Sequence, residues 1–251
     1  MNTGLLLKDK NVVITGAGSG IGASVVAASV NQGATAIGLD IDRDKGRGVV
    51  ESSGGTFYQC DVSQVDAWSS IAAKLADTIG KIDHLHLNAG IQSAPPSANI
   101  KDYRFAALQI DRYKKMMGVN VDGVVLGLHY LLPLMNNGGS IVVTGSLAGV
   151  VPYDIDPLYS MSKHAVTGLV RSLKWELREQ GLRINALCPG GIDTGIIPHD
   201  QRTKDATFMS PDHVATEVIN LFLTKETGST WAKVAESKPA YIMHPPGKRR
   251  E

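Results

Sequence analysis

The chain has little cysteine, and its two cysteines stand far apart. Only Cys60 and Cys188 occur in 251 residues, which excludes a disulfide framework. No Cys-x-x-Cys pair or Cys/His cluster has the spacing of a metal site, so we expect no bound metal. Two small, reduced core thiols are the expectation that remains, and reduced thiols are typical of a cytoplasmic protein.

An excess of charge of one sign is also missing. Lys and Arg total 25, Asp and Glu total 24, and the formal net charge is +1. Without a basic field, we expect neither nucleic acid nor an anionic membrane as a partner. No run approaches the ~18 apolar residues of a membrane span. The first ten residues hold only the short run Leu5-Leu6-Leu7, which predicts no signal peptide and a cytoplasmic location.

What the chain does contain is an alternation of short apolar runs and longer amphipathic stretches. Strands are expected at 11–15, 35–39, 56–59, 85–87, 140–144 and 183–187. Helices are expected at 21–32, 65–79, 113–135 and 159–180, the third with Met117, Val121, Val124, Leu128 and Leu132 facing inward. This order predicts an α/β fold: a doubly wound parallel sheet (Rossmann fold) with helices on both faces. We expect a single domain over 1–251, with a peripheral tail at 237–251.

The first expected strand ends in a glycine-rich stretch, Thr15-Gly16-Ala17-Gly18-Ser19-Gly20-Ile21-Gly22. Read from Gly18, it meets the dinucleotide fingerprint G-x-G-x-x-G/A, with alanine in the last place. Glycines let the backbone approach a ligand, and the N-terminus of the helix that comes next attracts a pyrophosphate. For a glycine loop alone, a tight strand-to-helix turn is the alternative interpretation.

The second expected strand ends at Asp40, about 20 residues after the loop, where dinucleotide folds place an acid against the ribose hydroxyls. A carboxylate there repels a 2′-phosphate, so we expect NAD as the cofactor and not NADP. Asp42 is able to share this role. Arg43 is a signal in the opposite direction, because an arginine can hold that phosphate. A surface acid at a strand end is the alternative for Asp40.

Further motifs come after the loop TGAGSGIG in a fixed order: LNAG at 87–90, Ser146 after a strand, YSMSK at 159–163 and PGGIDT at 189–194. With these motifs, the chain resembles the short-chain dehydrogenase/reductase family, in its compact single-domain branch. The resemblance runs from Lys8 to Thr194. It implies an NAD-dependent enzyme that transfers a hydride between nicotinamide and a secondary alcohol or ketone. It also implies a homotetramer or homodimer formed through the helices at 113–135 and 159–180.

The resemblance and the fingerprint together imply a set of functional residues. The cofactor site comprises Gly16, Ser19, Gly20, Ile21, Gly22, Asp40, Ile41, Asp61, Val62, Asn88, Ala89, Gly90, Tyr159, Lys163, Pro189, Gly190, Ile192 and Thr194. The catalytic group comprises Asn120, Ser146, Tyr159 and Lys163. The chain departs from the family at Leu87, where asparagine is frequent, and after Thr194, where the usual Asp-Gly-Gly ending is missing. The family's C-terminal subunit contacts are therefore not carried over.

Proton transfer explains why the chemistry uses a tyrosine and a lysine four residues apart. Oxidation of a carbinol needs a base for the hydroxyl proton, and the reverse reaction needs an acid. Residues i and i+4 share a helix face, so we expect Lys163 to lower the pKa of Tyr159 from about 10. By resemblance, Lys163 also reaches the nicotinamide ribose, Ser146 orients the substrate oxygen, and Asn120 holds a water that links Lys163 to solvent. An exposed, energetically minor Tyr–Lys pair is the alternative.

The segment 195–211 comes directly after the expected nicotinamide loop, and by resemblance it forms a mobile substrate lid. Ile196 and Phe208 would give this lid a partly apolar inner surface. Tyr153 and His199 are further candidates for substrate contacts.

Two other functions stay open for such a chain. An epimerase or dehydratase on the same scaffold tends to be longer, with a substrate domain of its own. An NAD(H)-binding sensor or scaffold protein without turnover would be expected to lack Ser146, Tyr159 or Lys163, and all three are present.

Overall fold

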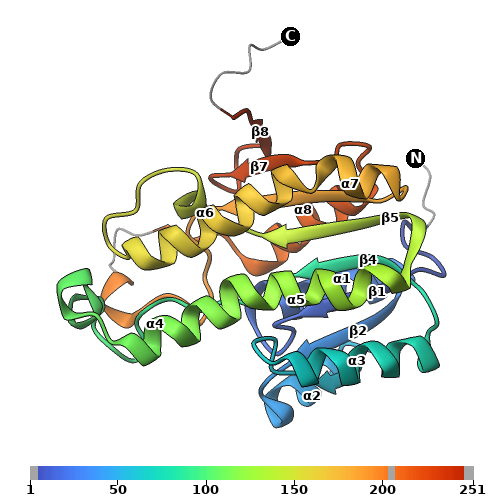
Figure 1. Ribbon diagram of the computed structural model, residues 1–251, viewed down its shortest axis with the longest axis horizontal. Helices are drawn as coiled ribbons and strands as arrows, with labels where there is room; N and C mark the ends of the chain where they lie inside the picture. The colour runs from blue at the N-terminus through green and yellow to red at the C-terminus, as the bar shows by residue number, and fades with distance from the viewer. Residues whose placement is uncertain (1–4, 203–206, 246–251) are drawn as a thin grey trace.

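The computed structural model describes residues 5–202 and 207–245 and places an eight-stranded sheet at the centre of the molecule (Figure 1). The strand order is β3-β2-β1-β4-β5-β6-β7-β8, and every pairing is parallel except that of β8 with β7. The strands are β1 Asn11–Thr15, β2 Thr35–Asp40, β3 Thr56–Gln59, β4 Ile82–Leu87, β5 Met135–Thr144, β6 Arg183–Pro189, β7 Ser229–Lys233 and β8 Tyr241–Met243. The predicted doubly wound α/β fold is confirmed.

Helices cover both faces of the sheet (Figure 1). One face carries α1 Gly20–Asn31, α2 Arg43–Ser52 and α8 Pro211–Leu223, whose buried residues share one hydrophobic cluster. The other carries α3 Val65–Thr78, α5 Gly123–Leu131, α6 Pro157–Ser172 and α7 Lys174–Glu179, which share a second cluster. Cys60 and Cys188 lie in this second cluster as free, buried thiols, as expected.

The expected helix 113–135 is a composite of several helical segments. It begins as α4 Ile110–Met117, passes through a π-helical turn at Gly118–Asp122, continues as α5 and closes in a short 3₁₀ turn. A π turn adds a residue to the helical repeat and rotates the next helical segment about the axis. Val124 and Leu128 are buried as expected, whereas Met117, Val121 and Leu132 are only half-buried, and Asn120 takes a fully buried position.

Several elements had no counterpart among the sequence predictions. The helix α2 is rich in charged residues, and α8 begins at Pro211, at the end of the segment expected to form a lid. β7 and β8 form the far edge of the sheet, so part of the expected peripheral tail joins it as an antiparallel strand. The remaining short turns are 3₁₀ helices at Ile100–Tyr103, Phe105–Ala107, Leu132–Leu134, Leu147–Gly149 and His199–Gln201.

The composite helix Ile110–Leu134 is long and apolar enough to cross a membrane, judged by length and composition alone. Its buried residues Val124, Leu128 and Leu131 belong to the cluster that also holds Trp68 of α3. This packing against the sheet accounts for the apolar residues on its inner side, since the core-facing stripe of a helix must be hydrophobic.

The strand order reverses direction between β1 and β4, because β2 and β3 extend the sheet on one side and β5 to β8 extend it on the other. In open α/β sheets, ligands bind at this switch point, outside the carboxyl ends of the strands. Four of the predicted motifs lie at that edge: the glycine loop after β1, LNAG at the end of β4, Ser146 after β5 and PGGIDT at the end of β6, while YSMSK lies in the first turns of α6.

Candidate active site

A cavity of about 740 Å³ opens at the carboxyl edge of the sheet. Among the sequence-predicted residues, those that line it are Gly16, Ser19, Gly20, Ile21, Asp40, Ile41, Asp61, Val62, Asn88, Ala89, Gly90, Ser146, Tyr159, Lys163, Pro189, Gly190, Ile192 and Thr194. Gly22 and Asn120 lie outside the lining. The structure therefore brings residues from the whole length of the predicted motifs to one cavity.

The glycine loop forms an open cradle before α1. Gly16 has φ +65°, and a Cβ at Gly22 would lie 2.1 Å from the carbonyl oxygen of Gly16, so both positions require glycine. Ser19, at the N-cap of α1, makes no side-chain capping bond. The first N–H groups of α1 therefore receive no side-chain acceptor from the N-cap and can donate to a ligand such as a phosphate.

The carboxylate of Asp40 is fixed at the rim of the cavity. Its Oδ2 accepts from Gly18 N at 2.8 Å, and its Oδ1 accepts from Asp42 N at 3.0 Å. The side chain of Asp42 instead caps α2 by accepting from Lys45 N at 3.0 Å. Neither Asp42 nor Arg43 lines the cavity, so among these three residues only Asp40 is placed to meet a ligand there.

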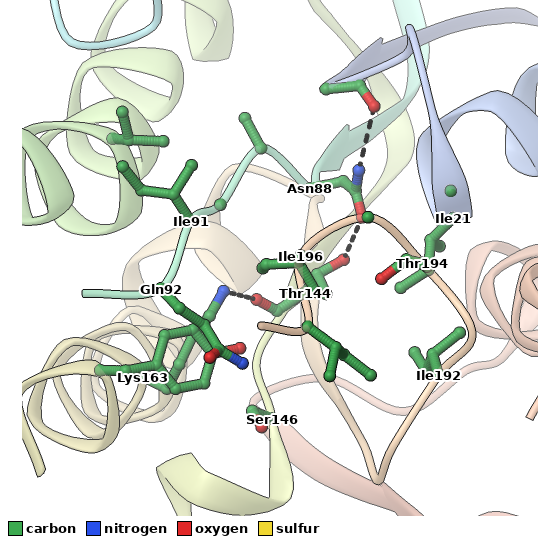
Figure 2. Close-up of a pocket in the computed structure, with 18 of the residues that line it drawn as sticks. Ile21, Asn88, Ile91, Gln92, Thr144, Ser146, Lys163, Ile192, Thr194 and Ile196 are labelled. Atoms are coloured by element: carbon green, nitrogen blue, oxygen red, sulfur yellow. Dashed lines mark hydrogen bonds between the residues drawn. The ribbon is translucent and has the colours of Figure 1, made fainter. Parts of the chain in front are cut away.

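A hydrogen-bond network joins the strand ends at the switch point (Figure 2). Thr144 Oγ1 donates to Asn88 Oδ1 at 3.0 Å, and Asn88 Nδ2 donates to Thr15 O at 3.0 Å. Because the single hydroxyl proton of Thr144 goes to Asn88, the 2.8 Å bond between His86 Nε2 and Thr144 Oγ1 has the histidine as donor. The network locks β1, β4 and β5 together beneath the cavity.

Asn120 lies behind the cavity wall, in the π-helical turn, with 1% of its surface exposed. Its Oδ1 accepts from Ile91 N at 2.8 Å, and its Nδ2 donates to Ile91 O at 2.9 Å and to Ser162 Oγ at 3.0 Å. Both amide hydrogens are thus taken by protein groups. In this structure Asn120 fixes the chain after β4 against α6, and a role in holding water stays a prediction.

Tyr159 and Lys163 lie on α6, one turn apart, and both are buried. Lys163 Nζ donates to Thr144 O at 2.8 Å and lies 5.7 Å from the centroid of the Tyr159 ring. Burial lowers the pKa of the Lys163 ammonium to about 8. Burial also raises the pKa of the Tyr159 phenol above its ordinary value, and a hydrogen bond with Ser146 opposes this shift. The expected lowering of the tyrosine pKa by Lys163 is not seen, because desolvation is the largest cause of the shift and raises the pKa.

Asp156 is a positioning residue that the sequence predictions missed. It caps α6, with its Oδ1 accepting from Tyr159 N at 3.0 Å and from Ser93 Oγ at 2.7 Å. Pro157 stands next, at the first helical position. An aspartate before a proline is a helix-start signal, and reading it would have placed the start of the helix correctly.

The expected lid is described at 195–202 and 207–211, and residues 203–206 and the side chain of His199 lie outside the described part. Ile196 and Phe208 line the cavity, as does Tyr153, whose hydroxyl donates to Gln201 Oε1 at 3.1 Å. The segment therefore supplies apolar cover to the cavity.

The C-terminal segment around residues 233–236 forms hydrogen bonds with the loops that border the cavity. Gly190 N donates to Lys233 O at 2.9 Å, and Ser210 N donates to Glu236 Oε1 at 2.5 Å. Lys233 is itself buried and paired with Glu217 of α8 at 3.0 Å. The atypical C-terminal sequence thus contacts both the expected nicotinamide loop and the end of the lid.

Comparison with known proteins agrees with these observations. Residues 10–205 match the family model described as short chain dehydrogenase. A 2,5-dichloro-2,5-cyclohexadiene-1,4-diol dehydrogenase of Sphingobium indicum is 35% identical over 204 residues, or 79% of this chain and 78% of that protein. A 3beta-hydroxysteroid dehydrogenase of Mediterraneibacter gnavus is 33% identical over 192 residues, which are 74% of this chain and 67% of that protein.

A plant protein and a solved structure extend the comparison. Short-chain dehydrogenase reductase 3a of Arabidopsis thaliana is 33% identical over 207 residues, or 80% of this chain and 78% of that protein. A crystal structure of a short-chain dehydrogenase/reductase, glucose/ribitol dehydrogenase, from Brucella melitensis has a TM-score of 0.79 at 24% identity, over 94% of this chain and 98% of the other. At that identity the likeness concerns the fold alone.

Proposed function

The chain belongs to the short-chain dehydrogenase/reductase family, and from this premise we propose that it is an NAD-dependent oxidoreductase of secondary alcohols and ketones. One observation carries the proposal: Ser146, Tyr159 and Lys163 line the same cavity as the glycine cradle and Asp40. A sensor or scaffold protein would have no use for a buried tyrosine and lysine in the place where a substrate meets the cofactor.

The residues present fit a dinucleotide. The glycine cradle and the N-terminus of α1 would hold the pyrophosphate, and Asp40 would accept hydrogen bonds from the adenosine ribose. Asp61 and Val62 line the same cavity and would border the adenine, while Ile192 and Thr194 would contact the nicotinamide. A bound NAD supplies the hydride acceptor and, in its reduced form, the hydride donor.

Tyr159 is the proposed general acid and base. Burial, which raises the pKa of its phenol, keeps the proton available for the alkoxide formed when a ketone is reduced. In the oxidation direction, the phenolate form of Tyr159 must take the hydroxyl proton and become the phenol, and the charge of Lys163, whose Nζ lies 5.7 Å from the ring centroid, favours this ionised form. Ser146 would orient the substrate oxygen toward Tyr159.

We also propose NAD as the preferred cofactor, a cytoplasmic location and a homodimer or homotetramer. The position of Asp40 supports the cofactor preference, since its negative charge would repel a 2′-phosphate. Apolar residues on the lid side of the cavity, such as Ile196 and Phe208, favour a cyclic or otherwise hydrophobic alcohol. Relatives whose names specify a cyclic diol and a hydroxysteroid agree with such a substrate.

The decisive variant is Tyr159→Phe, which removes the transferable proton and keeps the ring. We expect turnover to fall by about 10²-fold or more, the usual contribution of general acid–base catalysis. NADH binding, followed by fluorescence titration, should change little, because the glycine cradle and Asp40 are untouched. The assay is a panel of secondary alcohols with NAD and of ketones with NADH, read by absorbance.

The matched control is Tyr130→Phe, on α5 and away from the cavity, which should keep wild-type turnover. Undiminished turnover in Tyr159→Phe would exclude the proposed acid–base role. If the wild type binds NADH and converts no member of the panel, the result favours a sensor or scaffold protein over an enzyme.

A further inference from the structure

The segment 91–93 enters the cavity after β4 and is held by side chains from other elements. Beside the two bonds from Asn120 described above, Arg112 donates to Gln92 O at 3.0 Å and to Ser93 O at 2.8 Å. Asp156 accepts from Ser93 N at 2.9 Å through its second oxygen. The backbone on both sides of Gln92 is therefore fixed before any ligand binds.

The side chain of Gln92 has no such support. It lines the cavity with only 7% of its surface exposed, and its Oε1 has no hydrogen-bond partner among the described residues. Figure 2 shows Gln92 on the side of the cavity where Lys163 and Ser146 lie. A buried amide oxygen without a partner is unfavourable, so its place beside the expected reaction centre calls for a ligand that supplies the missing donor.

A second glutamine that lines the cavity also has an unpaired amide atom. Gln201 also lines the cavity, and its Oε1 already accepts from Tyr153, while its Nε2 is buried with no partner in the described part of the chain. Apolar side chains such as Ile91 and Ile197 line the same cavity, and they cannot form a hydrogen bond with either amide. One acceptor and one donor are thus left free in a largely apolar space.

We propose that Gln92 and Gln201 recognise a second hydroxyl group of the substrate, so that the enzyme prefers a diol or hydroxyketone to a simple alcohol. A hydroxyl donates one hydrogen bond and accepts others, and it therefore satisfies an amide oxygen and an amide nitrogen alike. The proposal rests on the proposed function, because it names the substrate class of the same site.

The test is calorimetric binding of cyclohexanol and of the regioisomeric cyclohexanediols to the NADH-saturated protein, a mixture in which no turnover takes place. We expect at least one diol to bind wild type about tenfold more tightly than cyclohexanol, the value of one added neutral hydrogen bond. In Gln92→Leu this ratio should fall to about one. Gln180→Leu, an exposed position just after α7, should keep the ratio.

Stability provides a second readout. Because Gln92→Leu removes an unpaired buried polar group, its thermal midpoint without ligand should be unchanged or higher. A lower midpoint would mean that Gln92 has a structural role, and it would count against the proposal.

The remaining outcomes separate this inference from the proposed function. Equal affinity of wild type for cyclohexanol and every diol overturns the glutamine subsite, as does an unchanged ratio in Gln92→Leu. Turnover with NAD is measured in parallel on the same compounds. Oxidation without a preference for diols contradicts the subsite alone, whereas selective diol binding without oxidation upholds the subsite and contradicts the proposed function.

Discussion

The carboxylate of Asp40 is the charge that a dinucleotide would meet at the rim of the cavity. Two backbone N–H groups hold it there, and the neighbouring acid, Asp42, is occupied at the N-cap of α2. A fixed negative charge beside a ribose acts through simple repulsion, which a 2′-phosphate feels and a hydroxyl does not. We therefore expect the choice between NAD and NADP to depend on the side chain of Asp40.

We expect Asp40→Asn to shift the cofactor preference toward NADP. The amide oxygen can still accept from Gly18 N, whereas the bond from Asp42 N is lost, so the variant removes the charge and keeps one of the two hydrogen bonds that hold the side chain. The ratio of kcat/KM with NADP to that with NAD should rise about tenfold or more, which corresponds to about 1.4 kcal/mol. Asp42→Asn, which removes a charge two residues away, should leave this ratio unchanged. Equal ratios in Asp40→Asn and wild type would exclude Asp40 as the discriminating group.

Tyr159 and Lys163 show what the sequence can and cannot predict about a single residue. Their spacing correctly predicts a shared helix face, because that results from local helical geometry. Their pKa values depend on burial, which the whole tertiary structure sets, so the expected lowering of the phenol pKa was wrong. The unpaired amide of Gln92 could not be predicted either, since it depends on which groups fail to reach it.

The strand β4 carries two buried histidines, and its pH response is a property of the element. Burial lowers the pKa of His84 to about 4 and that of His86 to about 3, from an ordinary value of 6.5. Both are neutral in the fold, so the stability that depends on them is complete above pH 6.5 and is lost as the pH falls toward 4. Within this pH range, the free energy of unfolding changes by about 1.4 kcal/mol per pH unit for each histidine. The lowered pKa of Asp83 acts only below its ordinary value of 3.8.

Urea unfolding between pH 8 and pH 4.5 checks this slope. His86→Leu lowers stability at every pH by breaking the bond to Thr144, yet we expect its stability to depend less steeply on pH than that of wild type. His129→Gln, on the exposed side of α5, should keep the wild-type slope. Identical slopes for wild type and His86→Leu would contradict a neutral, buried His86.

Elements differ in how far local sequence determines them. The helices α1 and α3 were predicted to within two residues, because apolar periodicity and their glycine or polar boundaries agree. The π-helical turn that buries Asn120 was not predictable, since its extra residue changes the register without a local signal. The pairing of β8 with β7 depends on contacts between segments that only the folded chain brings together.

At the level of the whole molecule, the sheet topology assembles the cavity. The motifs were predictable as strand ends, and parallel strands place their carboxyl ends on one edge of a sheet, so their convergence was a consequence of the fold class. The hydrogen bonds between the C-terminal segment and the loops at the cavity were not predictable from these rules. They arise because Lys233 and Glu236 lie beside loops that precede them by many residues.

The outer surface of the α4–α7 layer supports the proposed oligomer. Val125 on α5, Met161 on α6 and Trp175 on α7 are large apolar residues with 43% or more of their surface exposed. Figure 1 shows α5 and α6 on the same face of the sheet, with β5 visible between them. Exposed apolar residues grouped on one face are typical of an interface between subunits.

Sedimentation equilibrium should therefore give wild type the mass of a dimer or tetramer. The double variant Val125→Glu/Met161→Glu should shift that mass toward the monomer, because a charge buried at an interface without a partner is strongly unfavourable. Leu223→Glu introduces one glutamate at a similarly exposed apolar position of α8, on the other face of the sheet, and should keep the wild-type mass. A monomeric wild type would refute the oligomer. Dissociation by Leu223→Glu alone would instead place the subunit interface on the α8 face. Glu217 of α8 pairs with Lys233, whose carbonyl oxygen accepts from Gly190 N at the cavity. In that case the state of assembly and the structure of the cavity would be linked through this pair.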